Sequence, residues 1–228
     1  MRIQEITEAV VSPDQELIQQ IMPEIEAAVE EYLDSIDNDE HDFNELEEIL
    51  NSNLEDDFPV EFIADDTARK NPREIVSAGA SWDETEGAHI TLYLHTDNLS
   101  TQFDRLIPEI EKKIAHETVH FAQYKRMGAE KLKRHQSGHQ KGTELARRTG
   151  RERDWLRSYL RDPHELQAYG RDLAQEISQT GNPEQALRNP EQYRSELSTY
   201  DQMRSVFPSN TPQIKQLLKY AAVYLNRA

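Results

Sequence analysis

The chain has 228 residues, of which 43 are acidic and 26 are lysine or arginine, so its formal net charge is −17. Such a negative chain would repel phosphates, and we expect no nucleic-acid partner. Cysteine is absent, which excludes disulfides, thiolate metal ligands and cysteine nucleophiles. No apolar run approaches the roughly 18–20 residues that span a bilayer, and the first residues lack the pattern of a secretion signal. These features predict a soluble, cytoplasmic globular protein with no membrane partner.

The charge is distributed unevenly along the chain. Residues 1–68 hold 22 acidic residues and a single basic one, whereas residues 125–161 hold 12 basic and 4 acidic residues. Each run fits an ordinary solvated surface. The alternative is that the acidic N-terminal region contacts the basic 125–161 segment within the molecule, in which case salt would weaken the contact.

Two helices are predicted in the acidic first third of the chain. Ser12 and Pro13 form a typical helix start, because serine can cap a helix and proline fits its first turn. The apolar residues that follow recur at helical steps of three and four: Leu17, Ile18, Ile21, Ile25, Val29 and Leu33. Pro23 lies inside this pattern and is expected to kink the helix. A second helix is predicted over residues 42–54.

A small β-sheet is predicted after residue 57. Three short segments rich in β-forming residues are separated by turn-forming or charged stretches. The segments are residues 58–64, 74–82 and 88–95. In the third segment Ile90, Leu92 and Leu94 alternate with other residues, which gives that strand one apolar face.

The rest of the chain has a helical pattern. Helices are predicted near residues 101–127, 143–161, 163–180, 190–206 and 212–226. The predicted fold class is α+β, mainly helical, with an antiparallel or mixed sheet of about three strands next to the first of these helices. We expect three regions: an acidic helical N-terminal region (1–57), a core (58–180) and C-terminal helices packed on that core (181–228).

Residues 116–120, with the sequence HETVH, form the motif that carries chemistry. His116 and His120 are four residues apart, so on a helix both imidazoles point the same way and can bind one metal ion. Glu117 would lie beside a metal-bound water and could take its proton as a general base. The metal that this arrangement favours is a catalytic zinc ion, Zn²⁺.

The helical wheel separates the two histidines from the apolar face of their helix. At about 100° per residue, Ile110, Ile114 and Phe121 share one side, and His116 and His120 lie on nearly the opposite side. One face would dock on the core, and the other would present both imidazoles to the element across it. A pair of surface histidines is the alternative interpretation.

A catalytic zinc site needs a third protein ligand. In the longer motif HExxHxxGxxH that ligand is a histidine, but Gln123 and Arg126 stand where the glycine and the histidine belong. A glutamate from a later helix is the other common solution. Glu165 is the best candidate, because Pro163 begins a helix on which Glu165 lies at the edge of the buried side. His164 would replace it if that helix is rotated, and an ordinary first-turn glutamate is the alternative.

The motif and the downstream glutamate resemble the zincin metallopeptidases of the gluzincin type. The surroundings of Glu165 are similar to those in small HExxH proteins of phage and bacterial genomes. The resemblance covers roughly residues 58–180 and implies a metallopeptidase core that cleaves a protein or peptide substrate, with the two histidines and Glu165 on zinc and Glu117 as general base. It also implies that the strand over residues 88–95 forms the sheet edge along which an extended substrate lies.

Hydrolysis also needs a hydrogen-bond donor for the oxyanion that develops on the substrate. Tyr169 is the first candidate for a catalytic role of this kind, because it lies one turn from Glu165; Tyr159 and His164 follow. Asp172 is a candidate for the acid that would hold an imidazole through its second nitrogen.

Two other functions stay open from the sequence. One is a non-catalytic interaction or structural protein on the same scaffold, with the acidic region as a docking surface for a basic partner. The other is a metal-dependent hydrolase with a substrate other than a peptide. Residues 128–150, between the two predicted ligand helices, contain four glycines, which is typical of a mobile lid; a solvated surface loop is the alternative.

Overall fold

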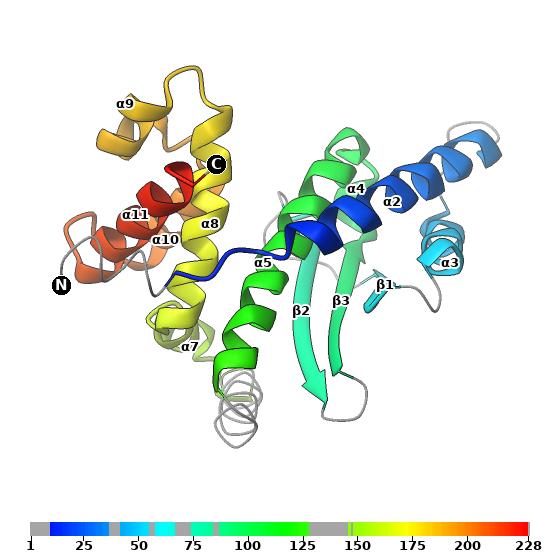
Figure 1. Cartoon of the computed structure of the whole chain (residues 1–228), viewed down its shortest axis with the longest axis horizontal. Helices are drawn as coiled ribbons and strands as arrows, with labels where there is room; N and C mark the ends of the chain where they lie inside the picture. Colours follow the sequence, from blue (N-terminus) through cyan, green and yellow to red (C-terminus); the bar gives the residue numbers. More distant parts are fainter. Residues whose placement is uncertain are drawn as a thin grey trace. The chain divides into compact units, whose positions relative to one another are not determined.

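The fold is α+β and mainly helical, with one small mixed sheet, as predicted (Figure 1). The structure is a computed structural model that describes residues 10–36, 42–54, 58–66, 74–83, 87–127, 146 and 148–227. It divides into two compact units: a first unit, Pro13–Phe121, and a second unit that joins Met1–Ser12 to Ala122–Ala228. The division falls inside a single helix, α5 (Leu106–Met127). The division into three regions stays a prediction.

Helices α2 (Gln15–Ser35) and α3 (Phe43–Leu54) pack against each other in the first unit. Helix α2 begins where the Asp14 carboxylate accepts a hydrogen bond from the Leu17 N–H at 3.1 Å. The predicted cap, Ser12, is therefore wrong by two residues. Aspartate caps a helix as well as serine does, and it lies next to the first turn.

The apolar face of α2 differs from the predicted face at its C-terminal end. Tyr32 is fully buried, whereas Leu33 is 47 % exposed. Around the helix Tyr32 lies about 20° from the buried Ile25 and Leu33 about 80° from it, so the tyrosine continues the buried stripe. The helix continues past Pro23 without interruption.

The sheet contains β1 (Val60–Asp65), β2 (Val76–Asp83) and β3 (Gly87–His95), in the order β1-β3-β2. Strand β3 pairs in parallel with β1 and antiparallel with β2. It is therefore the central strand, and the expectation that residues 88–95 form a substrate-binding edge is wrong. The consecutive strands β2 and β3 are antiparallel neighbours, and β1 pairs with the other side of β3.

Strand β3 has one apolar face and one polar face. The residues of the apolar face are completely buried, as their alternation predicts: Ile90, Leu92 and Leu94. On the other face, the buried His95 lies with Nε2 2.9 Å from the Ser77 hydroxyl and Nδ1 3.5 Å from the Asp65 carboxylate. This one imidazole thus joins all three strands.

Helix α3 covers the outer edge of β1. The Asn51 side chain donates to the Phe62 carbonyl at 2.9 Å and accepts from the Phe62 N–H at 2.8 Å. The Ala64 N–H donates to the Glu47 carboxylate at 2.6 Å. These bonds satisfy backbone groups that an edge strand otherwise leaves to solvent or to a partner.

The second unit consists mainly of helices (Figure 1). They are α7 (Glu152–Tyr159), α8 (Pro163–Gln179), α9 (Pro183–Arg188), the 3-10 turn η2 (Pro190–Tyr193), α10 (Ser198–Val206) and α11 (Pro212–Leu225). The single helix predicted over residues 190–206 is thus two elements. Helices α8 and α11 approach so closely at Gly170 that a Cβ at this position would collide with the Cβ of Tyr220. Glycine, which has no Cβ, permits this contact.

The segment before α2 belongs to the second unit. Val10 and Val11 are each 3 % exposed, and Val10 joins the hydrophobic cluster of the C-terminal helices. The Tyr224 hydroxyl donates to the Val11 carbonyl at 2.6 Å, and Arg227 donates to the Val10 carbonyl at 3.1 Å. The two ends of the described chain are therefore tied together. No helix in the described ranges is both long and apolar enough to cross a membrane.

Candidate metal centre

The HETVH motif lies in the buried middle of α5, which follows the sheet through α4 (Thr96–Leu99) and the 3-10 turn η1 (Phe103–Arg105). His116, Glu117 and His120 are 7 %, 6 % and 3 % exposed. Every residue from 114 to 121 is buried, so this part of the helix has no solvent-facing side. The alternative of two surface histidines is therefore wrong.

The two imidazoles face the same way, as their spacing predicts. Their ring centroids are 5.1 Å apart and the ring planes are inclined by 66°. One helical turn separates the two residues, and both rings are shielded from water. This is the arrangement in which two imidazole nitrogens can reach one ion.

Glu165 lies in the first turn of α8 and is 4 % exposed. The turn begins at Pro163, and the Asp162 carboxylate accepts the cap hydrogen bond from the His164 N–H at 2.8 Å. Proline in the first turn and an aspartate cap together define the start of this helix. His164 is only partly buried, so Glu165 is the side chain that points inward.

His116, His120 and Glu165 together form a group that could hold a metal ion. Each is buried and offers one ligand atom, and these atoms all lie within 4.8 Å of one another. Ligand atoms about 2.1 Å from a tetrahedral zinc ion are roughly 3.4 Å apart. Two imidazoles and a carboxylate suit zinc and other divalent transition metals. A buried carboxylate is also costly unless a cation or hydrogen bonds compensate its charge.

Gln123 also belongs to this region, although no role was predicted for it. It stands where the longer motif HExxHxxGxxH has a glycine. It is 3 % exposed and lies three residues after His120 on α5. Its amide nitrogen donates to the His164 carbonyl and to the Gln167 side-chain oxygen, both at 3.1 Å. The signal in the sequence was its helical spacing from the two histidines, which places all three side chains on one face.

The other predicted participants lie in the second unit. Tyr169 is partly buried, and its ring packs against the hydrophobic cluster of that unit. Tyr159 stacks on Trp155, with 5.1 Å between the ring centroids. Asp172 is 3 % exposed, and its carboxylate lies 3.6 Å from the Arg171 guanidinium. The roles of Tyr169 and Asp172 in catalysis stay predictions.

Two further predictions fall on residues outside the described ranges. Most of residues 128–150 are not described, so the predicted lid stays a prediction. The predicted contact between the acidic region and the basic 125–161 segment is untested for the same reason.

Comparison of the chain with protein-family models, with curated proteins and with solved structures finds no match. The resemblance to gluzincin metallopeptidases therefore rests on the motif residues alone.

Proposed function

We propose that the protein is a zinc-dependent metallopeptidase of the cytoplasm, with His116, His120 and Glu165 as zinc ligands. The observation that carries this proposal is that three buried side chains offer ligand atoms within 4.8 Å of one another. Three protein ligands leave one position of a tetrahedral ion open, as in catalytic zinc sites. When bound, the ion would polarise the attacking water and the scissile carbonyl.

Glu117 is the general base in this proposal. It follows His116 directly in the chain and is 6 % exposed, so its side chain is shielded from bulk solvent. As the water oxygen bonds to the carbonyl carbon, Glu117 takes the proton; as the C–N bond breaks, Glu117 passes that proton to the amine nitrogen. Tyr169 stays the first candidate for the oxyanion donor.

We infer that the substrate binds as an extended peptide along β2. Strand β3 is paired on both sides, and α3 covers the outer edge of β1. Among the described strands, β2 is therefore the edge to which a peptide could add by main-chain hydrogen bonds. The proposed substrate strand is therefore β2 and not β3.

The proposal is tested by metal analysis and peptide cleavage with the purified full-length protein. We expect one equivalent of zinc, and cleavage of a fluorogenic peptide library that stops when a chelator removes the metal. Glu117→Gln should keep the zinc and lower turnover by about 10²–10⁴-fold. His120→Ala should lose both. Glu109→Gln, on the same helix but paired with Arg105 at 2.8 Å, is the matched control and should behave as wild type.

Each other outcome has a definite meaning. Full activity of Glu117→Gln would contradict the assignment of the base. Zinc without cleavage of any peptide would favour a non-catalytic protein on the same scaffold, or a hydrolase with another substrate. A protein that binds no zinc would refute the proposal.

A further inference from the structure

We propose that Gln123 and Gln167 are positioning residues for the metal site. A buried chain of neutral hydrogen bonds, here called the amide chain, runs from Gln123 through Gln167 and Tyr224 to the Val11 carbonyl and sets where Glu165 stands. The inference rests on the proposed metal site and assigns a role to residues outside its ligand set.

The first link holds the residues on both sides of Glu165. Gln123 donates to the carbonyl of His164, the residue before the glutamate, and to the side chain of Gln167, two residues after it. Gln123 lies three residues after His120 on helix α5. The turn of α8 that carries Glu165 is thus hydrogen-bonded to a residue of α5, the helix that carries the two imidazoles.

The later links hold Gln167 in turn. Its amide nitrogen donates to the Tyr224 hydroxyl at 3.4 Å, and that hydroxyl donates to the Val11 carbonyl at 2.6 Å. Gln123, Gln167 and Tyr224 are 3 %, 6 % and 8 % exposed. Water therefore competes little for these bonds, and each group depends on its protein partner.

The amide chain permits one arrangement of its hydrogen atoms. Backbone carbonyls, which can only accept, stand at both ends, at His164 and at Val11. Reversing the amide of Gln123 or Gln167 would set two acceptors or two donors against each other. Burial raises the pKa of the Tyr224 phenol above its ordinary value, so the hydroxyl keeps its proton as a donor. Because only one assignment of donors and acceptors satisfies all its hydrogen bonds, the amide chain specifies the positions of its side chains more narrowly than apolar packing does.

The experiment measures zinc affinity of the full-length protein by competition with a chromophoric chelator. Gln123→Met and Gln167→Met keep the side-chain length and remove the hydrogen bonds. We expect each to weaken zinc binding by about 10–100-fold, as loss of the groups that orient metal ligands usually does. Tyr224→Phe should have a smaller effect, because the bond between the two glutamines remains. The double variant should lose less affinity than the two single losses combined, since both substitutions break the same Gln123–Gln167 bond.

A matched control separates positioning from general loss of stability. Met203 is completely buried in the hydrophobic cluster of the second unit, so Met203→Ala should destabilise that unit without removing a hydrogen-bonding group of the amide chain. The visible spectrum of the cobalt-substituted protein should change in Gln123→Met, because the ligand geometry changes, and should not change in Met203→Ala. If one glutamine variant fails to fold, the other and Tyr224→Phe give the same comparison.

The possible results are distinct. Wild-type zinc affinity in both glutamine variants would overturn the inference and leave the proposed function standing. An equal loss in Met203→Ala would also overturn it, because the effect would then be one of stability. Absence of zinc binding in the wild-type protein would overturn the proposed function and this inference together.

Discussion

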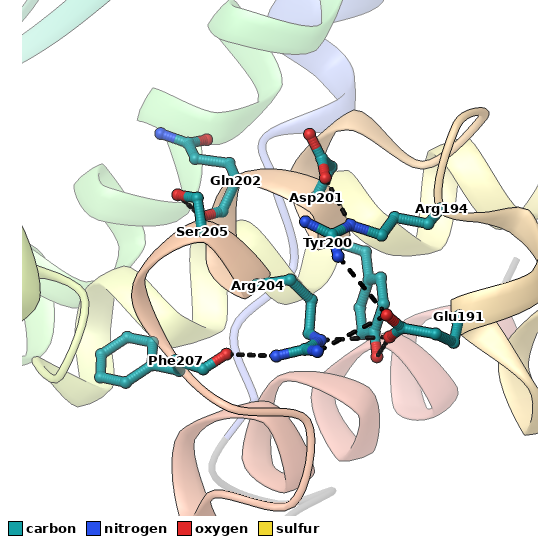
Figure 2. Close-up of polar contacts among 8 residues, drawn as sticks. All are labelled: Glu191, Arg194, Tyr200, Asp201, Gln202, Arg204, Ser205 and Phe207. Atoms are coloured by element: carbon teal, nitrogen blue, oxygen red, sulfur yellow. Dashed lines mark hydrogen bonds and ion pairs between the residues drawn. The ribbon is translucent and has the colours of Figure 1, made fainter.

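The second unit holds two polar clusters that differ in their exposure to water. The amide chain consists of neutral groups, and its three side chains are at most 8 % exposed. The second cluster, here called the surface cluster, surrounds η2 and α10 and consists of Glu191, Arg194, Tyr200, Asp201 and Arg204 (Figure 2). The side chains of Glu191 and Asp201 are 51 % and 45 % exposed.

The hydrogen bonds of the surface cluster involve charged groups, which make stronger individual bonds than the neutral groups of the amide chain. Arg194 donates to Asp201 at 2.5 Å, and Glu191 accepts from Tyr200 at 2.9 Å and from Arg204 at 3.1 Å. Charged groups at the surface can exchange these bonds for bonds to water at little cost, whereas buried amides cannot. We therefore expect exposure to water, more than charge, to decide how firmly each cluster holds its geometry.

The largest expected effect concerns metal-linked stability. Zinc at about 1,000 times its dissociation constant should raise the free energy of unfolding of the wild-type protein by about 4 kcal/mol. His120→Ala should abolish this increase, because the ligand set is incomplete, and Glu191→Gln in the surface cluster should leave it intact. His89→Ala, at a histidine that is 43 % exposed, is the control and should also leave it intact. Urea unfolding with and without zinc measures the increase. If zinc still stabilised His120→Ala to the same extent, His120 would not be a zinc ligand.

The next effect compares the clusters directly, without metal. Gln167→Met leaves buried partners of the amide chain unsatisfied and should lower the free energy of unfolding by about 1–3 kcal/mol. Glu191→Gln should lower it by less than about 1 kcal/mol, because water replaces the lost partners. Urea unfolding of the metal-free proteins gives both values. A larger loss in Glu191→Gln would reverse the ranking of the two clusters.

The parts of the site that could be predicted from the sequence are those marked by local patterns. His116, Glu117 and His120 are recognisable because their spacing places them within about one helical turn. Glu165 is recognisable because a proline and an aspartate cap mark the start of its helix. Glu165 is buried, in agreement with its predicted place at the edge of the buried side of its helix, and the alternative of two surface histidines is wrong.

The amide chain could not be predicted, because its links join residues far apart in sequence. They span 41, 44, 57 and 213 positions, and no local pattern relates Val11 to Tyr224. The position of β3 was missed for a related reason: the alternation of its side chains gives its apolar face, but the order of strands depends on distant partners. Tyr32, by contrast, could have been placed by counting seven residues on from Ile25.

Salt should sharpen the difference between the clusters. In 1 M sodium chloride the Debye length falls to about 3 Å, so the stability loss in Glu191→Gln should shrink toward zero. The loss in Gln167→Met should stay the same, because the amide chain is neutral and buried. Urea unfolding at low and high salt measures both, and a salt-dependent loss in Gln167→Met would mean that charge contributes to the amide chain.

The smallest expected effect is the pH dependence of the surface cluster. The hydrogen bond from Arg204, followed by that from Tyr200, lowers the pKa of Glu191 below its ordinary value of 4.5. The folded state therefore favours the carboxylate, so the stabilisation is fully present above about pH 4.5 and is lost as the pH falls through the lowered pKa. Because Glu191 is half exposed, the difference between wild type and Glu191→Gln should stay below about 1 kcal/mol and should vanish at the acid end. Unfolding measured from pH 6 down to pH 3 tests this, and a difference that grew on acidification would mean that Glu191 is held in its protonated form.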